Sequence, residues 1–462
     1  MRDELDVLVV GGGPAGICAA IQSAALGART GLVEKNGALG GTTTVAGVAL
    51  PGLFHAWGRQ IIAGVGWRLV REAVEVGGTT LPDFSRWDLP HYRLQVPVSA
   101  AVYAALADRA VTDAGVGLLL HTMVADVSWT GERWRVVLCG KEGLREVSAA
   151  RVVDCTGDAD VVALAGLPRL RNPERQPGTL MVRFGGYDHR SLAGIDLDAL
   201  DRAYDAALAD GTLRADDFQS AAHPLRKLLR HRGENAIHVT GVDGGTSRTR
   251  TEAELAGRRA LLRIFRFLRA QPGLERLSVD SWAVETGIRE TFTIDGVARV
   301  TVDDYRGGRL WADALSYSFY PIDVHRSDGD GIDIRPLDYG VLPTIPRGAM
   351  VPRGAPGSLL VAGRAVAGDQ EANSAYRVQA SCMAMGQAAG TVAALSVRDG
   401  TAVLDVPVPA IHRTLRATGA IVPGDVTVPP QPPPGPAGPG PRLPGPAGPS
   451  QKLPAQPVKE ES

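Results

Sequence analysis

A glycine-rich turn between an apolar run and a segment of small residues constrains this chain more than any other feature. Residues 5–10 (LDVLVV) predict a buried strand, and Gly11, Gly13 and Gly16 follow it at once. Residues 17–26 (ICAAIQSAAL) predict a helix that starts directly after this turn. A Gly-x-Gly-x-x-Gly segment between a strand and a helix is the arrangement that binds the phosphates of a dinucleotide.

Each residue of the turn has a physical role in such a site. Gly11 permits the tight turn, Gly13 lets a pyrophosphate approach the backbone, and Gly16 allows the helix to pack closely on the strand. Pro14 and Ala15 open the helix, whose free N–H groups and positive dipole end favour an anion. The alternative interpretation is a glycine turn in some other α/β protein.

An acidic residue ends the second strand of this unit. The strand is expected over 30–33, with Glu34 and Lys35 directly after it. A carboxylate at this position accepts hydrogen bonds from the ribose hydroxyls of a nucleotide, which disfavours a 2′-phosphate. NAD and FAD both fit this fingerprint, so the rest of the chain must distinguish them.

Two later segments favour FAD. Residues 151–158 (RVVDCTGD) form an apolar strand that ends in Thr-Gly, and residues 356–363 (PGSLLVAG) form another that ends in Gly. A nucleotide that meets the N-terminal unit, a mid-chain turn and a C-terminal strand is long, as FAD is. An NAD site usually needs only the first half of such a domain. The pattern resembles two-domain flavoproteins of the glutathione-reductase type.

The overall composition excludes several classes of protein. The 462 residues carry 49 Lys and Arg against 50 Asp and Glu, which disfavours binding to nucleic acid or to an anionic membrane. Four cysteines lie far apart, so a disulfide scaffold, a zinc ribbon and a ferredoxin-like cluster are excluded, and we expect no metal site. No secretory signal precedes the first strand and no window approaches ~20 uninterrupted apolar residues, so we expect a cytoplasmic protein without a membrane span.

The length suggests two to three structural units in an α/β fold. The expected boundaries are 1–170 for the first part of a Rossmann-like FAD-binding domain, 171–345 for an inserted α+β substrate domain, 346–422 for the returning part of the FAD-binding domain, and 423–462 for a Pro-rich disordered tail. Within the first part, one strand over 118–127 and strands over 133–138 and 145–153 predict a meander. The tail has almost no apolar residues to bury, which is typical of disorder or polyproline II.

Several stretches together resemble FAD-dependent oxidoreductases related to the flavoproteins of succinate dehydrogenase and fumarate reductase. These stretches are Val7–Lys35, Leu39–Thr44, Gly58–Val70, Asp113–Val127, Arg151–Val161, Glu285–Gly296, Tyr320–His325, Leu359–Gly368 and Arg377–Leu395. They span nearly the whole chain except the tail and residues about 171–280. The first and last report flavin binding in general, whereas YPIDVH (320–325) and CMAMGQAAG (382–390) are more specific to the subgroup.

The resemblance implies where the cofactor lies. Leu39–Thr44 would line the flavin and the pyrophosphate, the backbone at Met123–Ala125 would meet the adenine, and Arg377–Gln379 would open a helix aimed at the isoalloxazine. Such a helix end stabilises the negative charge that reduction places on the flavin. The cofactor-binding residues expected in all are Gly11, Gly13, Pro14, Ala15, Gly16, Glu34, Lys35, Gly41, Thr42, Thr43, Val124, Thr156, Gly157, Asp158, Gly363, Arg364, Arg377 and Val378.

Two departures from the family pattern stand out. Many flavoproteins end the C-terminal strand in Gly-Asp, but this chain has Gly363-Arg364, so the usual carboxylate to the ribityl hydroxyl is absent there. The LGGTTT region (39–44) has no cysteine, which argues against electron transfer to clusters or heterodisulfides. His55 resembles the histidine that carries covalent flavin in some relatives, but its local pattern differs, so we expect FAD to be bound without a covalent link.

Three residues are candidates for catalysis. His325 could act as a general base, because the pKa of a histidine lies near the working pH, or it could be a core histidine bonded to backbone. Arg289 could clamp a substrate carboxylate, or it could form an ion-pair cluster with Glu285 and Glu290. Tyr320 could present its hydroxyl to a pocket or serve as a wall residue, and the same alternatives apply to Tyr376.

The sequence therefore predicts an FAD-dependent oxidoreductase, a dehydrogenase or oxidase that transfers a hydride between a small polar organic substrate and flavin N5. One alternative is a flavin-dependent monooxygenase or halogenase, although the W-x-W-x-I-P motif and the Gly-Asp strand end are both absent. Another is a non-catalytic flavoprotein interaction module whose Pro-rich tail docks an SH3-like partner. A homo-oligomer is also compatible with the sequence.

Overall fold

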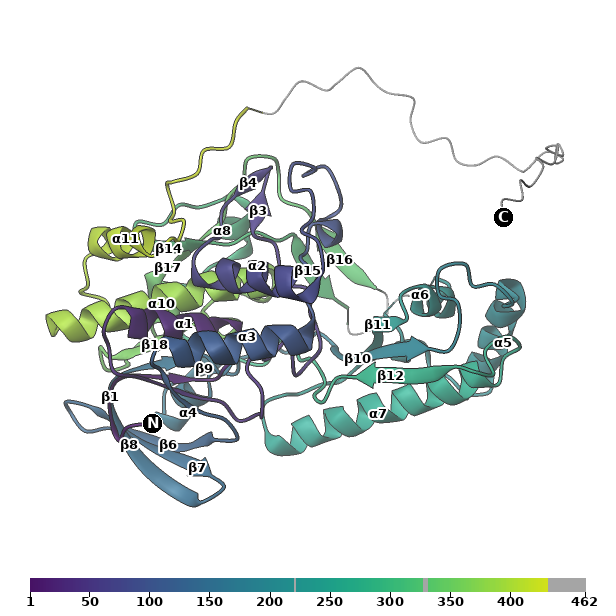
Figure 1. Cartoon of the computed structure of the whole chain (residues 1–462), viewed down its shortest axis with the longest axis horizontal. Helices are drawn as coiled ribbons and strands as arrows, with labels where there is room; N and C mark the ends of the chain where they lie inside the picture. The colour runs from purple at the N-terminus through teal and green to yellow at the C-terminus, as the bar shows by residue number, and fades with distance from the viewer. Residues whose placement is uncertain (220–221, 327–330, 431–462) are drawn as a thin grey trace, which may run out of the picture. The chain divides into compact units, whose positions relative to one another are not determined.

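A central sheet that is mostly parallel organises the computed structural model, which describes residues 1–219, 222–326 and 331–430 (Figure 1). The strand order is β5-β2-β1-β8-β7-β6, and β18 also pairs with β8. β5, β2, β1, β18 and the later part of β8 run parallel, whereas β6, β7 and the start of β8 form an antiparallel meander. These strands are β1 (Glu4–Val10), β2 (Thr30–Val33), β5 (Gly117–Leu119), β6 (Met123–Trp129), β7 (Trp134–Gly140), β8 (Gly143–Asp154) and β18 (Leu359–Val361).

The β1-α1-β2 unit forms where the glycine turn predicts it. Gly11 adopts φ +98°, and a Cβ there would lie 2.5 Å from the carbonyl oxygen of Cys155, so only glycine fits. Helix α1 (Pro14–Ala25) starts with proline, whose fixed φ suits a first helical residue. A Cβ on Gly16 would lie 1.8 Å from the Gly11 carbonyl oxygen, so its absence lets α1 pack against the turn.

The single strand expected over 118–127 is wrong, because the chain turns between β5 and β6. His121 has φ +52°, outside the extended region, and its N–H donates to the carbonyl oxygen of Asn36 at 3.1 Å. The N–H of Thr122 donates to the carbonyl oxygen of Glu34 at 3.0 Å. These bonds carry the chain over the end of β2, so β6 pairs with β7 at the opposite edge of the sheet from β5.

Helix α10 (Gln379–Asp399) returns from the C-terminal region to pack on α1. A Cβ on Gly386 would lie 2.0 Å from the carbonyl oxygen of Ala15, and one on Gly390 would lie 2.3 Å from that of Ala19, so both glycines permit close contact. Among the described residues, α10 alone is long and apolar enough to cross a membrane by length and composition, but 89% of its apolar window is buried inside the fold. The start of α10 consequently lies beside the glycine turn.

A second hydrophobic core lies in the lobe formed by the middle of the chain (Figure 1). Its members include Leu180, Phe218 and Ile264, whereas Ile294 and Ile345 pack into the first core. The lobe consists of β10 (Gly178–Gly185), β11 (Gly233–Val239), β12 (Ser278–Trp282), α5 (Leu197–Ala209), α6 (Pro224–Arg230) and α7 (Ser247–Arg269). An inserted domain with boundaries at 171 and 345 stays a prediction, as do the other domain boundaries.

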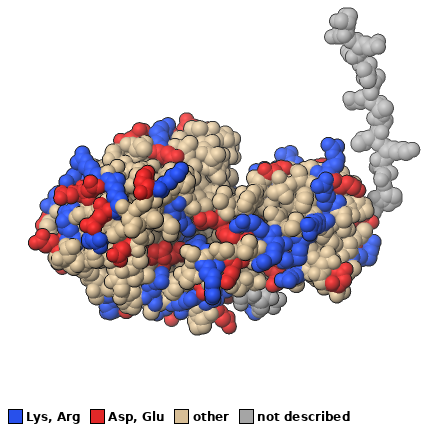
Figure 2. All heavy atoms as spheres, turned by 90° about the horizontal axis from the view of Figure 1, so that it is seen from below, with Lys and Arg blue, Asp and Glu red and all other residues tan. Residues whose placement is uncertain are grey.

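The remaining elements complete one compact unit over Met1–Val428. They are β3 (His55–Ala56), β4 (Arg59–Gln60), α2 (Val65–Gly77), α3 (Ala100–Asp113), α4 (Asp160–Leu164), β9 (Arg169–Leu170), β13 (Thr293–Ile294), α8 (Val302–Arg306), β14 (Ala314–Tyr317), β15 (Ile322–His325), β16 (Ile332–Arg335), β17 (Thr344–Pro346), α9 (Gln370–Tyr376) and α11 (Val408–Ala417). Acidic and basic side chains both occur over the face seen in Figure 2, which agrees with their near-equal numbers of 50 and 49.

The end of this unit lies beyond the predicted start of the tail at 423. The N–H of Gly424 donates to the Tyr317 hydroxyl at 2.8 Å, and Asp425 forms an ion pair with Arg416 at 2.8 Å. These contacts tie residues 424 and 425 to the folded unit. The rest of the predicted tail, residues 431–462, lies outside the described residues.

Candidate active site

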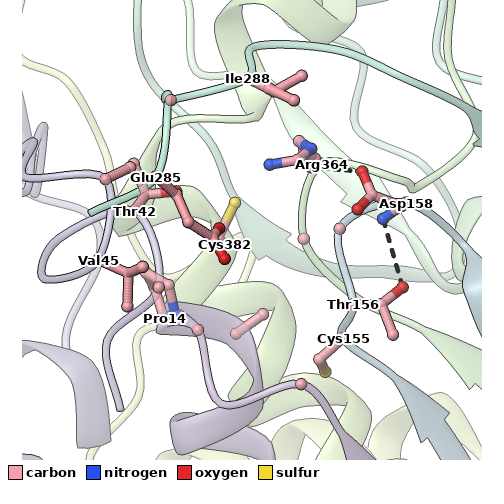
Figure 3. Close-up of a pocket in the computed structure, with 18 of the residues that line it drawn as sticks. Pro14, Thr42, Val45, Cys155, Thr156, Asp158, Glu285, Ile288, Arg364 and Cys382 are labelled. Atoms are coloured by element: carbon pink, nitrogen blue, oxygen red, sulfur yellow. Dashed lines mark hydrogen bonds and ion pairs between the residues drawn. The ribbon is translucent and has the colours of Figure 1, made fainter. Parts of the chain in front are cut away.

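A cleft with about 870 Å³ of open space lies at the carboxyl ends of the parallel strands (Figure 3). Gly11 follows β1, Glu34 follows β2, Cys155 follows β8 and Ala362 follows β18, and all four line the cleft. In Figure 3, Pro14, Thr42 and Val45 lie on one side of the cleft, and Thr156, Asp158 and Arg364 lie on the other. The carboxyl edge of a parallel sheet is where doubly wound folds bind nucleotides.

Most of the residues expected to bind the cofactor line this cleft. They are Gly11, Gly13, Pro14, Ala15, Glu34, Lys35, Gly41, Thr42, Thr156, Gly157, Asp158, Gly363, Arg364 and Arg377. Gly16 instead supports the turn, and the Thr43 hydroxyl donates to Gln379 Oε1 at 2.5 Å. Val378 lines the neighbouring cavity. Val124 pairs with Leu138 in the meander, away from the cleft lining, so its place near the adenine stays a prediction.

Glu34 is fixed at the β2 end of the cleft by two backbone donors. The N–H of Gly12 donates to its Oε2 at 2.6 Å, and the N–H of Asn36 donates to its Oε1 at 2.8 Å. Lys35, next in the chain, forms an ion pair with Glu285 at 3.4 Å. The carboxylate is thus held in place where the fingerprint requires a ribose acceptor.

Asp158 is the centre of a buried charge cluster on the far side of the cleft. Its carboxylate accepts from Arg364 Nη2 and Arg250 Nη2, both at 2.5 Å, and from the Thr291 hydroxyl at 2.7 Å. Burial alone would raise the pKa of Asp158, but the guanidinium groups of Arg364 and Arg250 and the Thr291 hydrogen bond lower it to about 2. Asp158 is therefore ionised at every working pH.

A second cavity, with about 1060 Å³ of open space, adjoins this cleft. The two share the residues Thr42, Gly287, Ile288, Arg364, Arg377 and Gln379. His325, Arg289 and Tyr320, the three candidates for catalysis, all line the second cavity. Tyr320 and His325 belong to one segment, YPIDVH (320–325), and the fold brings Arg289 to them from a separate part of the chain. Their roles stay predictions.

The His325 side chain faces a carboxylate rather than backbone. Its Nε2 lies 3.5 Å from Asp323 Oδ1, and its buried Nδ1 has no hydrogen-bond partner among the described residues. Burial lowers the pKa of His325 to about 4, with Arg289 acting in the same direction and Asp323 opposing it. The imidazole is therefore neutral at neutral pH, with one nitrogen able to take a proton.

Arg289 does not form the alternative ion-pair cluster. Its Nη1 donates to the carbonyl oxygen of Pro177 at 2.6 Å and its Nη2 to Asn235 Oδ1 at 3.3 Å, and both partners are neutral. Glu290 instead accepts from Gln176 and Gln370, and Glu285 pairs with Lys35. Burial lowers the pKa of Arg289 to about 9, and the nearby Arg377 adds to this effect, so Arg289 still carries its charge near neutral pH.

Arg377 also has neutral partners and a free donor. Its Nη2 donates to Gln176 Oε1 at 3.0 Å and to the carbonyl oxygen of Asp323 at 3.2 Å. Its buried Nη1 has no partner among the described residues. Arg377 lines both the cleft and the cavity, so a ligand in either space could accept from this donor.

The two tyrosines and His55 lie in different surroundings. The Tyr320 hydroxyl accepts from Gln95 Nε2 at 2.9 Å at the edge of the cavity, and burial raises its pKa. The Tyr376 hydroxyl donates to the carbonyl oxygen of Val366, and Tyr376 is a buried core residue that lines neither the cleft nor the cavity. His55 stacks on Phe84 with ring centroids 3.8 Å apart and lines neither the cleft nor the cavity.

Several lining residues were not predicted from the sequence. Arg250 belongs to α7, and its contact with Asp158 spans 92 positions. Cys155 and Cys382 also line the cleft, and burial raises the pKa of both thiols, that of Cys382 to about 12. Both thiols are therefore neutral. Local spacing carried no signal for any of these three residues.

The cleft has the features that FAD requires. A Cβ on Gly13 would have no atom within 4 Å, so the backbone there is open to a pyrophosphate. Two buried donors without a partner among the described residues, Arg364 Nε and Arg377 Nη1, belong to residues that line both the cleft and the adjoining cavity. Gly11–Gly16 would hold the pyrophosphate, Glu34 the ribose, and Thr42, Arg364 and Arg377 the flavin end.

A Rossmann-like core with a cleft at the carboxyl ends of its parallel strands is typical of dinucleotide-binding proteins. Residues 6–415 match the family model described as "FAD dependent oxidoreductase", and the chain belongs to this family. It is therefore an FAD-dependent oxidoreductase and a flavoprotein. FAD is its cofactor.

Individual relatives match over short segments or at low identity. Dihydrolipoyl dehydrogenase from Trypanosoma brucei brucei is 56% identical over 52 residues, 11% of each chain. The mitochondrial dihydrolipoyl dehydrogenase of Pisum sativum is 60% identical over 40 residues, 9% of this chain and 8% of the relative. The matched segments thus span about a tenth of these relatives. A geranylgeranyl bacteriochlorophyll reductase-like structure from Thermoplasma acidophilum is 14% identical, with TM-score 0.42 over 90% of this chain and 83% of its own.

Proposed function

We propose that this enzyme transfers a hydride between FAD and a small polar organic substrate that carries an acidic group. FAD supplies the redox chemistry, because its N5 accepts or returns the hydride. The protein supplies the site that holds the substrate carbon against the cofactor and the group that moves the proton.

The observation that carries this proposal is the shared wall between the cleft and the cavity. Thr42, Arg364 and Gln379 line both spaces, so a substrate in the cavity would touch the flavin end of the cofactor. The cavity also holds a candidate base and a candidate anion-binding group within one lining, His325 and Arg289. These are the parts that a dehydrogenase or oxidase needs besides its flavin.

The charges of the cavity favour an acidic substrate group. Arg289 and Arg377 form their hydrogen bonds with neutral partners. Of the two carboxylates in the lining, Glu234 is exposed to solvent, and Asp323 offsets part of the charge of the two arginines, so two cations face one largely buried carboxylate. An arginine binds a carboxylate through two parallel hydrogen bonds, which would also orient the substrate.

His325 would take the proton that leaves with the hydride. Its Nδ1 has no partner among the described residues, and Asp323 beside Nε2 favours the tautomer in which Nε2 carries the proton. Tyr320 would orient the substrate, because its hydroxyl accepts from Gln95 and keeps its own proton free to donate.

The proposal makes a prediction about pH. Because burial and Arg289 lower the pKa of His325 to about 4, its basic form persists from neutral pH down to about pH 4. The acid limb of kcat/KM should therefore lie near pH 4 rather than near 6.5, and activity should fall only below it. NMR titration of the histidine Cε1 protons, with His325→Gln for assignment, checks this value without a substrate. A His325 that titrates near 6.5 would contradict the prediction.

One test distinguishes the proposed hydride transfer from the reaction of a flavin monooxygenase. A hydride-transferring dehydrogenase or oxidase obtains electrons from its organic substrate, whereas a flavin hydroxylase usually takes them from NADH or NADPH. We expect neither nicotinamide to reduce the bound FAD faster than free FAD in an anaerobic stopped-flow measurement. Rapid reduction by NADH or NADPH, with oxygen incorporated into the product, would favour the monooxygenase instead.

A further inference from the structure

Arg364 lies where the cleft and the cavity meet. It follows Gly363 (φ +96°) at the end of β18, and its side chain lines both spaces. Many flavoproteins have an aspartate at this position, so the charge here is reversed. Figure 3 shows the Arg364 side chain directed toward Asp158 across one end of the cleft.

The cluster around Arg364 keeps a net positive charge. Asp158 forms ion pairs with both Arg364 and Arg250, each at 2.5 Å, and one carboxylate neutralises only one of the two guanidinium groups. Thr291 adds a neutral donor. Glu285 and Asp160 also act on Arg250, but each has a cation of its own, because Lys35 pairs with Glu285 at 3.4 Å and Arg169 with Asp160 at 3.7 Å. The side chains of Arg364 and Asp158 are 19% and 8% exposed, so water screens this charge poorly.

One hydrogen-bond donor of Arg364, its Nε, has no acceptor among the described residues. This Nε is buried, whereas the Nη2 of the same side chain is bonded to Asp158. A buried donor without a partner is costly, so such groups in native proteins usually meet a ligand or a water. The Nε therefore marks Arg364 as a ligand-binding side chain rather than only a partner of Asp158.

The position of Arg364 along the cleft identifies which part of the cofactor it meets. Glu34 lies at the adenosine end and the turn Gly11–Gly16 at the pyrophosphate. Arg364 and Arg377 lie beyond the pyrophosphate, where the substrate cavity opens. The redox-active ring must reach that cavity for a substrate to react with it.

We propose that Arg364, held in place by Asp158, fixes a positive charge beside the redox-active ring and makes the bound FAD easier to reduce. Two-electron reduction of a flavin with uptake of one proton leaves a negative charge on the ring, and a nearby cation stabilises that product. The role is independent of which substrate reacts. It concerns only the reduction of the bound FAD, so it can be tested separately from the proposed hydride transfer.

Three variants test this proposal through the midpoint potential of the bound FAD, measured against a reference dye. Arg364→Gln removes the charge, while Arg250 still pairs with Asp158, so no buried carboxylate is left alone. We expect the equilibrium constant for reduction to fall at least tenfold, which is about 30 mV for two electrons. Arg364→Lys keeps the charge and should stay within threefold of wild type. Asp158→Asn leaves both guanidinium groups uncompensated and should shift the potential in the opposite direction, upward.

The opposite signs distinguish an electrostatic role from a structural one. General damage to the site would move Arg364→Gln and Asp158→Asn in the same direction, and that result would overturn the proposal. So would an unchanged potential in a folded, FAD-loaded Arg364→Gln. If Arg364→Gln does not retain FAD, the direction of the Asp158→Asn shift decides the matter. Arg353→Gln, at a side chain 62% exposed and outside both linings, is the matched control and should leave the potential unchanged.

Discussion

The Gly13→Ala variant is expected to fold like the wild type and to lose at least a hundredfold in FAD affinity, about 3 kcal/mol. A Cβ on Gly13 would have no protein atom within 4 Å, so the added methyl meets no steric barrier inside the fold. It would occupy the open space of the cleft that the pyrophosphate needs. Equilibrium dialysis of FAD measures the affinity, and thermal unfolding of the apoprotein measures the fold.

Two other glycines serve as controls for this result. Gly77→Ala, near the end of α2, brings a Cβ only to 3.7 Å from Ser99 and should leave both FAD affinity and stability close to wild type. Gly16→Ala places a Cβ 1.8 Å from the Gly11 carbonyl oxygen and should destabilise the fold itself. If Gly13→Ala binds FAD as tightly as the wild type, the pyrophosphate does not lie at this turn.

The second large effect is expected for His325→Gln, which should slow flavin reduction by the substrate about 10²–10⁴-fold. Glutamine fills the site and retains polar atoms, but it cannot accept the substrate proton at working pH. FAD content and substrate affinity should stay near wild type, because Arg289 and the cleft are unchanged. Anaerobic stopped-flow measurement of the flavin absorbance separates the rate of reduction from binding.

His231→Gln is the matched control for this variant. His231 is exposed at the end of α6 and lines neither the cleft nor the cavity, so its loss should not change the rate. A His325→Gln enzyme that reduces its flavin at the wild-type rate would show that another group, or solvent, takes the proton. A loss of FAD from this variant would instead assign His325 a structural role.

The parts of the fold and site that could be predicted rest on local patterns. The strand at 5–10, the glycine turn and Glu34 lie within 34 residues. Each can be recognised from its residues alone: an apolar run, a Gly-x-Gly-x-x-Gly motif and an acidic residue after a strand. The helix expected to open at Arg377–Gln379 is α10. Its segment is rich in small residues because Gly386 and Gly390 must lie against α1. Their side-chain chemistry made His325, Arg289 and Tyr320 candidates, and the cavity holds all three in one lining.

The rest depends on contacts between distant segments. Asp158 and Arg250 are 92 positions apart, and Arg364 is 206 positions from Asp158, so no periodicity links them. The turn that separates β5 from β6 follows from hydrogen bonds to Asn36 and Glu34, which a pattern of apolar residues over 118–127 does not reveal. Charge pairing inside a fold is set by tertiary geometry, so the cluster at Asp158 emerges only in three dimensions.

The most direct test of the central claim is anaerobic mixing of the FAD-loaded protein with a panel of small organic acids, each paired with its uncharged amide. The visible absorbance of the flavin reports its reduction, with no nicotinamide present. We predict that at least one acid rapidly bleaches the flavin and that its amide does so far more slowly. The Arg289→Met variant should lose this preference for the acid over its amide. Failure of every small acid to bleach the flavin, together with rapid bleaching by NADH or NADPH, would contradict the account.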